Sequence, residues 1–228
     1  MSKAKYPPNF IHEGRDFKAA WEEAVRFCLL NGLIIKPEEN SKTLTYDMCS
    51  KITLYGGAIK QILNKELHPK FPTKEAFQKI YTSEYTREWV AEQKLLPLDK
   101  QFVYNYMDRF INEFGIDQVI ILRDELRNGI SRRTQMITWN AKKDLTNKNP
   151  PCLQRVWVRI LNDDGDCEIH FDWRSRDLYG AWMSNYIGLF DMLNREIFSP
   201  LNLNVVKFVC NCNSLHIYQS DWEAAGKI

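Results

Sequence analysis

Asn149-Pro150-Pro151-Cys152 is the stretch around which the rest of the chain is interpreted. Two consecutive prolines fix the backbone torsion φ and exclude a helix, so the cysteine that follows them is held at the mouth of an extended segment. The thiol is therefore predicted to be presented rather than enclosed in a helix. Such a thiol can act as a nucleophile where positive charge lies nearby, because the thiolate is the reactive form.

Residues suited to nucleotide chemistry lie on both sides of this cysteine. They provide guanidinium groups, a hydroxyl, a carboxylate and an amide, which together suit covalent catalysis on a phosphorylated pyrimidine. They are Ser131-Arg132-Arg133, Trp139-Asn140, Arg174-Ser175-Arg176-Asp177, Asn185 and His216-Ile217-Tyr218. In the order and spacing of these residues the chain resembles the thymidylate synthase family, which includes the pyrimidine hydroxymethylases. The resemblance covers roughly residues 125–220, and the N-terminal part of the chain matches poorly.

Composition predicts one globular domain over residues 1–228, with residues 1–15 as a poorly ordered lead-in. The chain is 44% hydrophobic and 13% aromatic, which is enough to bury a core. A net charge of +2 argues against a nucleic-acid partner. Because no apolar stretch is long enough for a membrane span or a signal segment, a cytoplasmic protein without a membrane partner is expected. The six cysteines lack paired CxxC spacing, so neither a disulfide framework nor a metal site is expected.

Hydrophobic periodicity predicts an α/β fold. Helices are expected over residues 16–30, 74–93, 116–127 and 178–197, and strands over 33–36, 50–54, 134–139, 155–161, 168–173 and 204–210. The Asp/Gly-rich segment 162–166 predicts a hairpin between two of these strands, and Cys210 is expected to be buried on the last one. The resemblance implies a thymidylate synthase-type sandwich, with helices packed on a large mixed β-sheet and a homodimer formed through the sheet.

The resemblance also implies a nucleophile and a set of phosphate-binding residues. Cys152 would add to C6 of the pyrimidine, and Arg174 would supply the positive charge beside it. Arg174 and Ser175 would bind the substrate phosphate, while Arg132 and Arg133 would reach into the site of the neighbouring subunit. Arginine suits this task because its planar fork donates several charge-assisted hydrogen bonds.

His216 and Tyr218 match the family pair that hydrogen-bonds the sugar 3′-hydroxyl. Residues i and i+2 of a strand point the same way, so the two side chains are expected on one face. Gln154 is taken with the Pro-Pro-Cys-Leu-Gln segment as a substrate-binding residue. A loop of the family carries a basic residue to the phosphate; Lys36 or Lys42 is the candidate here, with solvated lysines as the alternative.

Glu84 and Glu88 are the candidates for the catalytic glutamate of the family. They are expected one turn apart on the predicted helix 74–93, but neither has the family's spacing to Trp89, and solvated surface carboxylates are the alternative. Tyr106 takes the place of the tyrosine that helps to move the C5 proton, with a core tyrosine as the alternative.

Asp177 matches the aspartate that anchors the pterin ring and orders water, with a carboxylate at a helix N-terminus as the alternative. Trp139 is placed with it in the cofactor site. Asn185 is expected to read the base, since its amide can donate to O4 and accept from N3–H of uracil. Cytosine presents the opposite pattern, although rotation of the amide could accommodate either base.

The reaction expected from the resemblance is conversion of dUMP to dTMP, with 5,10-methylenetetrahydrofolate or a related reduced pterin as co-substrate. The alternative is a pyrimidine 5-hydroxymethylase acting on dUMP, dCMP or CMP. It is motivated by the few residues, 219–228, that follow Tyr218, because a site open to water suits hydroxymethylation. A third hypothesis is a non-catalytic nucleotide-binding protein, motivated by the unmatched N-terminal part and the uncertain glutamate.

Overall fold

The computed structural model describes residues 5–38, 41–72, 83–101, 104–129 and 132–228. Its strands are β1 (Asn9–Gly14), β2 (Leu33–Ile35), β3 (Thr45–Tyr55), β4 (Gln135–Ile137), β5 (Leu153–Ile160), β6 (Asp166–Trp173), β7 (Arg176–Asp177) and β8 (Asn204–Tyr218). Its helices are α1 (Phe17–Asn31), α2 (Gly57–Leu63), α4 (Arg87–Lys94), α5 (Tyr106–Ile111), α6 (Gln118–Arg127), α7 (Ala141–Asp144), α8 (Trp182–Leu193) and α9 (Trp222–Ala225). Short 3-10 turns lie at Leu98–Lys100 and Gln219–Asp221, and a π-helical turn, Asn194–Phe198, continues α8.

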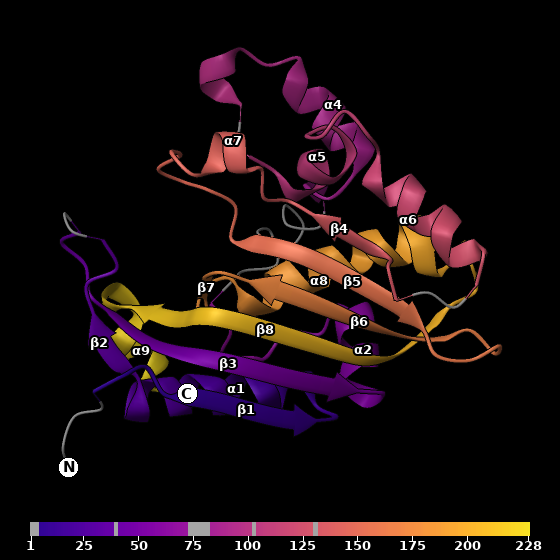
Figure 1. The fold of residues 1–228 in the computed structure, drawn as a ribbon. Helices are drawn as coiled ribbons and strands as arrows, with labels where there is room; N and C mark the ends of the chain where they lie inside the picture. Colours follow the sequence, from indigo (N-terminus) through magenta and orange to yellow (C-terminus); the bar gives the residue numbers. More distant parts are fainter. Residues whose placement is uncertain (1–4, 39–40, 73–82, 102–103, 130–131) are drawn as a thin grey trace.

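The described strands form one mixed sheet in the order β1-β3-β8-β6-β5-β4, with β2 paired to β3 and β7 to β8 (Figure 1). Strand β8 runs antiparallel to β3 but parallel to β6 and β7. Strands β5 and β6 form the predicted hairpin, whose turn contains Gly165 at a φ of +83°, a conformation that glycine adopts without steric cost. The predicted mixed sheet and the hairpin are confirmed.

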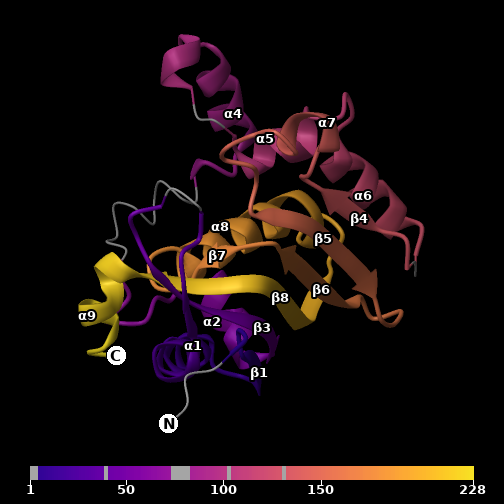
Figure 2. The ribbon, with the colours of Figure 1, turned by 60° about the vertical axis from the view of Figure 1, so that its left-hand side comes forward.

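Helices α1, α2 and α8 cover one face of the sheet (Figure 2). Helix α8 is the most buried of them, as its apolar sequence predicts, and it packs aromatic rings against the central strands. Tyr186 lies 5.8 Å from Phe171 of β6 and 4.8 Å from Phe208 of β8, measured between ring centroids. The predicted burial of Cys210 on β8 is confirmed as well.

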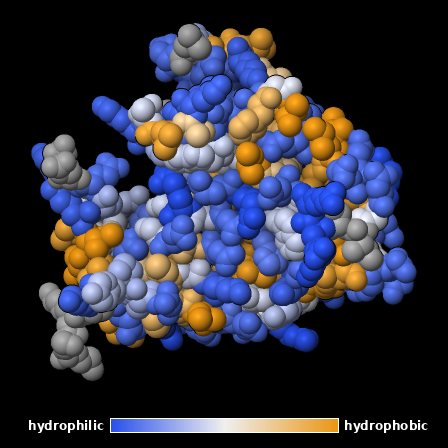
Figure 3. All heavy atoms as spheres, viewed as in Figure 1, coloured by the Kyte–Doolittle hydropathy of each residue, from blue (hydrophilic) through white to orange (hydrophobic). Residues whose placement is uncertain are grey.

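The opposite face of the sheet is turned toward the viewer in Figure 3 and is mostly hydrophilic. Charged residues of neighbouring strands are paired there: Arg155 lies 2.7 Å from Asp172, and Lys207 lies 3.2 Å from Glu168. Apolar side chains gather instead near α6 and β4, where Ile116, Ile120, Ile121 and Ile137 are exposed. A homodimer through the sheet stays a prediction.

Two predictions about the N-terminal half need correction. Residues 9–14 are not a poorly ordered lead-in, because Asn9–Gly14 pairs in parallel with residues 49–54 of β3. Phe10 of this strand is buried and packs on Phe27 of α1, with 5.1 Å between ring centroids, so the strand closes the edge of the core.

The predicted helix 74–93 is also wrong in part. Residues 73–82 lie outside the described residues, and the chain turns at 84–86 before α4 begins at Arg87. Thr86 caps α4: its hydroxyl accepts a hydrogen bond from the backbone N–H of Trp89 at 3.1 Å. Glu84 and Glu88 are therefore not on one helix face.

No helix in the described ranges is both long and apolar enough to cross a membrane.

Candidate active site

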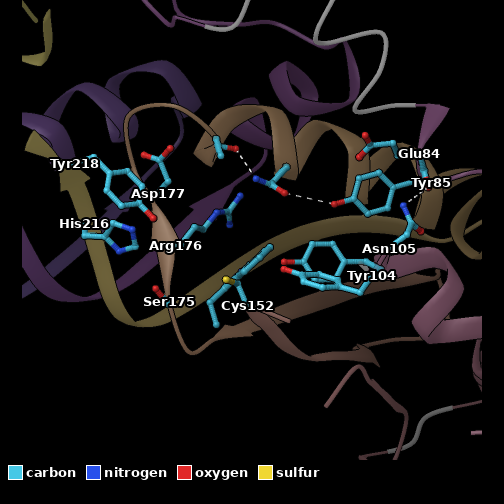
Figure 4. A pocket seen from close by; sticks show the side chains of 14 residues that line it. Glu84, Tyr85, Tyr104, Asn105, Cys152, Ser175, Arg176, Asp177, His216 and Tyr218 are labelled. Carbon is cyan, nitrogen blue, oxygen red and sulfur yellow. Dashed lines mark hydrogen bonds between the residues drawn. The ribbon is translucent and has the colours of Figure 1, made fainter. Parts of the chain in front are cut away.

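Two adjoining hollows meet at Cys152. The first hollow, of about 430 Å³, is lined by Glu84, Tyr85, Tyr104, Asn105, Tyr106, Cys152, Trp173, Ser175, Arg176, Asp177, Ala181, Asn185, His216 and Tyr218 (Figure 4). The second hollow, of about 560 Å³, shares Tyr104, Cys152, Ser175, His216 and Tyr218 with the first. Its other lining residues include Asp47, Lys148, Arg174 and Ser214. Both volumes are typical of small-molecule sites.

The position of Cys152 follows from the proline pair and from the strand pairing of β5 with β6. Arg174 donates hydrogen bonds to the carbonyl oxygens of Pro150 (2.7 Å) and Pro151 (3.0 Å), and its backbone N–H donates to the Cys152 carbonyl (3.0 Å). The same guanidinium places Nη2 3.7 Å from the Cys152 sulfur. The presented thiol and the adjacent cation that the sequence predicted thus lie in contact.

Two tyrosines flank the thiol on the other side. Tyr106 is half-buried at the start of α5, where its hydroxyl accepts a hydrogen bond from the Leu153 backbone N–H at 3.3 Å. The Tyr104 hydroxyl contacts both Tyr106 and Cys152. Burial raises the pKa of both phenols, and the electrostatic interaction with Cys152 acts in the same direction, so both are neutral at pH 7. The sequence analysis did not predict Tyr104 as a site residue. Its spacing of two residues from Tyr106 could have indicated it, because such residues point the same way in an extended segment.

A buried ion pair holds these tyrosines and the cysteine loop together. Arg109 of α5 donates two hydrogen bonds of 2.9 Å to Asp144 of α7, which precedes the proline pair. Asp144 also accepts from the Asn140 backbone N–H at 2.7 Å. Because α5 starts at Tyr106 and α7 leads to Cys152, this ion pair links the two walls of the first hollow.

Asn185 lies on the first turns of α8 and faces the first hollow. Its Nδ2 donates to the Ala181 carbonyl oxygen at 2.8 Å, and its Oδ1 lies 3.5 Å from the Tyr85 hydroxyl (Figure 4). A carbonyl oxygen can only accept, so the contact with Ala181 fixes which end of the amide faces the helix. One amide N–H and the remaining lone pairs of Oδ1 face the hollow.

Asp177 and Glu84 bring carboxyl groups to the first hollow. Asp177 Oδ1 accepts from the backbone N–H groups of Tyr179 and Gly180, both at 3.0 Å. A Cβ atom at Gly180 would meet Asp177 Oδ2 at 2.5 Å, so the glycine leaves room for the carboxylate. Burial is the main cause that raises the pKa of Asp177 and of Glu84. The carboxyl of Glu84 is thus better able to hold a proton near neutral pH.

His216 and Tyr218 extend from β8 on the same face, as alternation predicted, with 4.9 Å between ring centroids. Burial lowers the pKa of His216, so the imidazole is neutral at pH 7. Asp47 of β3 pairs in register with His216 and accepts from the Ser214 hydroxyl at 2.5 Å. Asp47 and Lys148 line the second hollow and had no signal in the sequence pattern.

Seven of the predicted site residues line neither hollow. Glu88 is exposed on α4, and both candidate lysines, Lys36 and Lys42, are exposed, although neighbours of each line the second hollow. Gln154 donates to the Pro151 carbonyl at 2.8 Å and so supports the cysteine loop. The other three are Arg132, Arg133 and Trp139, of which both arginines are exposed within this chain.

The chain matches the model of the thymidylate synthase family over residues 47–227, a range that contains Cys152 and most residues of both hollows. Three archaeal relatives carry the name "Putative thymidylate synthase". The proteins of Methanothermobacter marburgensis and Methanothermobacter thermautotrophicus are 34% and 33% identical over 142 residues, which cover 62% of this chain and 62% and 63% of theirs. The Methanopyrus kandleri protein is 25% identical over 215 residues, 92% of this chain and 94% of its own. This chain belongs to the thymidylate synthase family.

Proposed function

We propose that this protein transfers a one-carbon unit to C5 of a pyrimidine nucleoside monophosphate, and that its reaction is the conversion of dUMP to dTMP. The observation that carries the proposal is the contact of Arg174 Nη2 with the Cys152 sulfur, 3.7 Å apart, where the two hollows meet. Positive charge beside a sulfur favours the thiolate, which is the form that attacks. Family membership supports this reaction class.

Cys152 acts as the nucleophile. Its thiolate forms a bond to C6, and the electron pair of the C5=C6 double bond moves toward C5 and O4. C5 then becomes a carbon nucleophile for the one-carbon unit. After the new bond forms, the C5 proton leaves to a base, and the bond between the one-carbon unit and its folate carrier breaks. Hydride from the carrier, which ends as dihydrofolate, then completes the methyl group, and loss of the sulfur from C6 ends the cycle. Covalent addition thus replaces one difficult step by several easier ones.

The second hollow receives the phosphate and sugar in this proposal. Arg174 uses Nε and Nη2 for the proline carbonyls, which leaves Nη1 for a phosphate oxygen, with Ser175 and Lys148 beside it. Neutral His216 and Tyr218 hydrogen-bond the sugar hydroxyl. In a homodimer the partner's copies of the exposed Arg132 and Arg133 would complete the phosphate site.

Glu84 and Tyr104 accept and relay the proton that leaves C5. The raised pKa of Glu84, caused by burial, suits a carboxyl that accepts and returns a proton near neutral pH. Tyr104 touches the thiol and stays protonated, so it can relay a proton without becoming charged. Tyr106 orients Tyr104 and holds the Leu153 backbone.

The first hollow fits a reduced pterin. Asp177 offers a carboxylate, and Gly180 keeps the space that the carboxylate needs. Trp173 and Tyr85 add flat aromatic walls to the same hollow. Methylenetetrahydrofolate supplies the one-carbon unit and, for methylation, the hydride. Asp177 would orient the pterin, and the aromatic side chains would exclude water.

The test is intact-protein mass after incubation with 5-fluoro-dUMP and methylenetetrahydrofolate, because fluorine at C5 blocks loss of the proton and traps the covalent adduct. We expect an added mass equal to nucleotide plus folate on the wild-type protein and on Cys49→Ser, which removes a half-buried cysteine outside both hollows. Cys152→Ser should show none. An adduct that persists in Cys152→Ser would refute the assignment of the nucleophile.

Product mass then identifies the reaction. Incubation of dUMP with methylenetetrahydrofolate should yield the methyl product. A product that is heavier by one oxygen atom would show that the reaction is hydroxymethylation instead. A wild-type protein that forms no adduct with 5-fluoro-dUMP or 5-fluoro-dCMP, yet binds dUMP, would overturn the catalytic proposal in favour of a nucleotide-binding protein.

A further inference from the structure

Arg176 is a buried cation on the wall of the first hollow. The residue belongs to β7 and is only 3% exposed. Its guanidinium carbon lies 3.9 Å from the ring centre of Trp173 and 3.7 Å from that of Tyr186, so aromatic faces enclose it. It lines the same hollow as Cys152 and Asn185 (Figure 4).

The guanidinium is only partly satisfied. Nη2 donates to the Trp182 carbonyl oxygen at 2.6 Å, whereas Nε and Nη1 are buried and have no hydrogen-bond partner in the described part of the chain. Buried polar groups normally have partners, and a buried charge that lacks them is destabilising. Two unused donor nitrogens on a side chain that lines the same hollow as Cys152 therefore suggest a ligand that completes them.

The thiols and the phenol around Arg176 do not neutralise it, and Asp177, whose pKa is raised by burial and lowered by the charge of Arg176, does so only in part. Burial raises the pKa of Cys210 to about 11 even though Arg176 opposes the shift, and burial raises the pKa of Tyr186 and Cys212 well above their ordinary values. All three are neutral at pH 7. The adjacent carboxylate, on Asp177, already accepts two backbone hydrogen bonds through Oδ1.

We infer that Arg176 donates a hydrogen bond to O4 of the pyrimidine, stabilises the negative charge that forms there, and makes the site select uracil over cytosine. The inference deepens the proposed function and rests on it. When the Cys152 thiolate bonds to C6, the electron pair of C5=C6 shifts through C4 and the negative charge moves from sulfur to O4. A preorganised donor at this oxygen stabilises the addition product more than the free base.

Base selection follows from the chemistry of arginine. The guanidinium has donors only, so it pairs with the carbonyl oxygen on C4 of uracil and cannot accept from the amino group on C4 of cytosine. Asn185 can present either a donor or an acceptor through its amide. Arg176 cannot, so it removes the ambiguity that Asn185 leaves.

The experiment uses Arg176→Met and Arg176→Lys. Methionine keeps an apolar side chain between Trp173 and Tyr186 and removes the buried charge, together with the hydrogen bond to the Trp182 carbonyl oxygen. Release of tritium from C5 of [5-³H]dUMP without folate measures addition of Cys152 to C6 followed by proton exchange at C5. Arg127→Met, in an exposed ion pair with Asp124 on α6 and outside both hollows, is the control.

For Arg176→Met we expect a folded protein, a fall in the maximal exchange rate of about 10²–10³-fold with little change in the half-saturating dUMP concentration, and a smaller preference for dUMP over dCMP. Arg176→Lys should recover part of the rate, and Arg127→Met should match wild type. A folded Arg176→Met with wild-type exchange and base preference would refute the inference. A variant that unfolds would also count against it, because that outcome makes Arg176 a packing residue.

A nucleotide without O4, the 2-pyrimidinone deoxyribonucleoside monophosphate, tests the same contact from the ligand side. Wild type should bind this nucleotide more weakly than dUMP, and the difference in affinity should be smaller in Arg176→Met. Equal differences in the two proteins would exclude the contact between Arg176 and O4. Failure of the wild-type protein to form the 5-fluoro-dUMP adduct is a separate result, which refutes the proposed function itself.

Discussion

Replacement of Asp144 by asparagine should destabilise the protein strongly, because it removes one half of a buried ion pair. The Asp144 side chain is 0% exposed and that of Arg109 7% exposed. Two hydrogen bonds of 2.9 Å join them, so the variant leaves a buried guanidinium without its charged partner. Removing one partner of such a pair costs about 3–5 kcal/mol. Glu113, 3.8 Å from Arg109, remains as a second carboxylate and favours the lower end of this range.

For a domain of about this size, each kcal/mol lowers the melting temperature by about 2–4 °C, so the expected fall is about 6–20 °C. Calorimetry or urea denaturation measures it. Asp124→Asn is the control, because Asp124 and Arg127 form an exposed pair whose side chains are 53% and 58% exposed, and it should change stability by less than about 1 kcal/mol.

The double variant Arg109→Met with Asp144→Leu separates charge from packing. Replacement of both partners by apolar residues should recover much of the stability lost in Asp144→Asn, because no buried charge is left unpaired. Equal melting temperatures for Asp144→Asn and Asp124→Asn would refute the view that this ion pair joins α5 to the cysteine loop.

Two further predictions concern Asp177 and Tyr85, which line the first hollow. Burial raises the pKa of Asp177, so the folded protein binds this proton more tightly than the unfolded chain, and stability falls as pH rises through the raised pKa. Asp177→Asn should therefore melt at a higher temperature than wild type at pH 7. The difference in melting temperature should vanish below about pH 4, where the carboxyl is protonated in both states. A difference that calorimetry finds constant across pH would contradict this prediction. Tyr85→Phe removes the hydroxyl that meets Asn185 Oδ1 at 3.5 Å and should reduce the preference for dUMP over dCMP about five-fold, corresponding to about 1 kcal/mol, in competition binding. An unchanged preference would show that Asn185 is oriented without Tyr85.

Local sequence rules accounted for most of the secondary structure. Helix α1, the β5–β6 hairpin and buried α8 follow from hydrophobic periodicity and turn residues, which depend on near neighbours in the chain. The same rules failed at β1 and at residues 84–86. Strand β1 is fixed by parallel pairing with β3. At 84–86 the Thr86 cap starts a new helix where periodicity alone predicts a continuous one.

The sequence by itself determined the presentation of Cys152, through two prolines, and the common face of His216 and Tyr218, through strand alternation. Both are local consequences of backbone geometry. Only the tertiary structure decided that Tyr104 and Arg176 join them in one hollow, and that Glu88 and Trp139 do not. Which side chains converge depends on how β8 pairs with its neighbours and how α8 packs on the sheet, and these contacts join residues far apart in the chain.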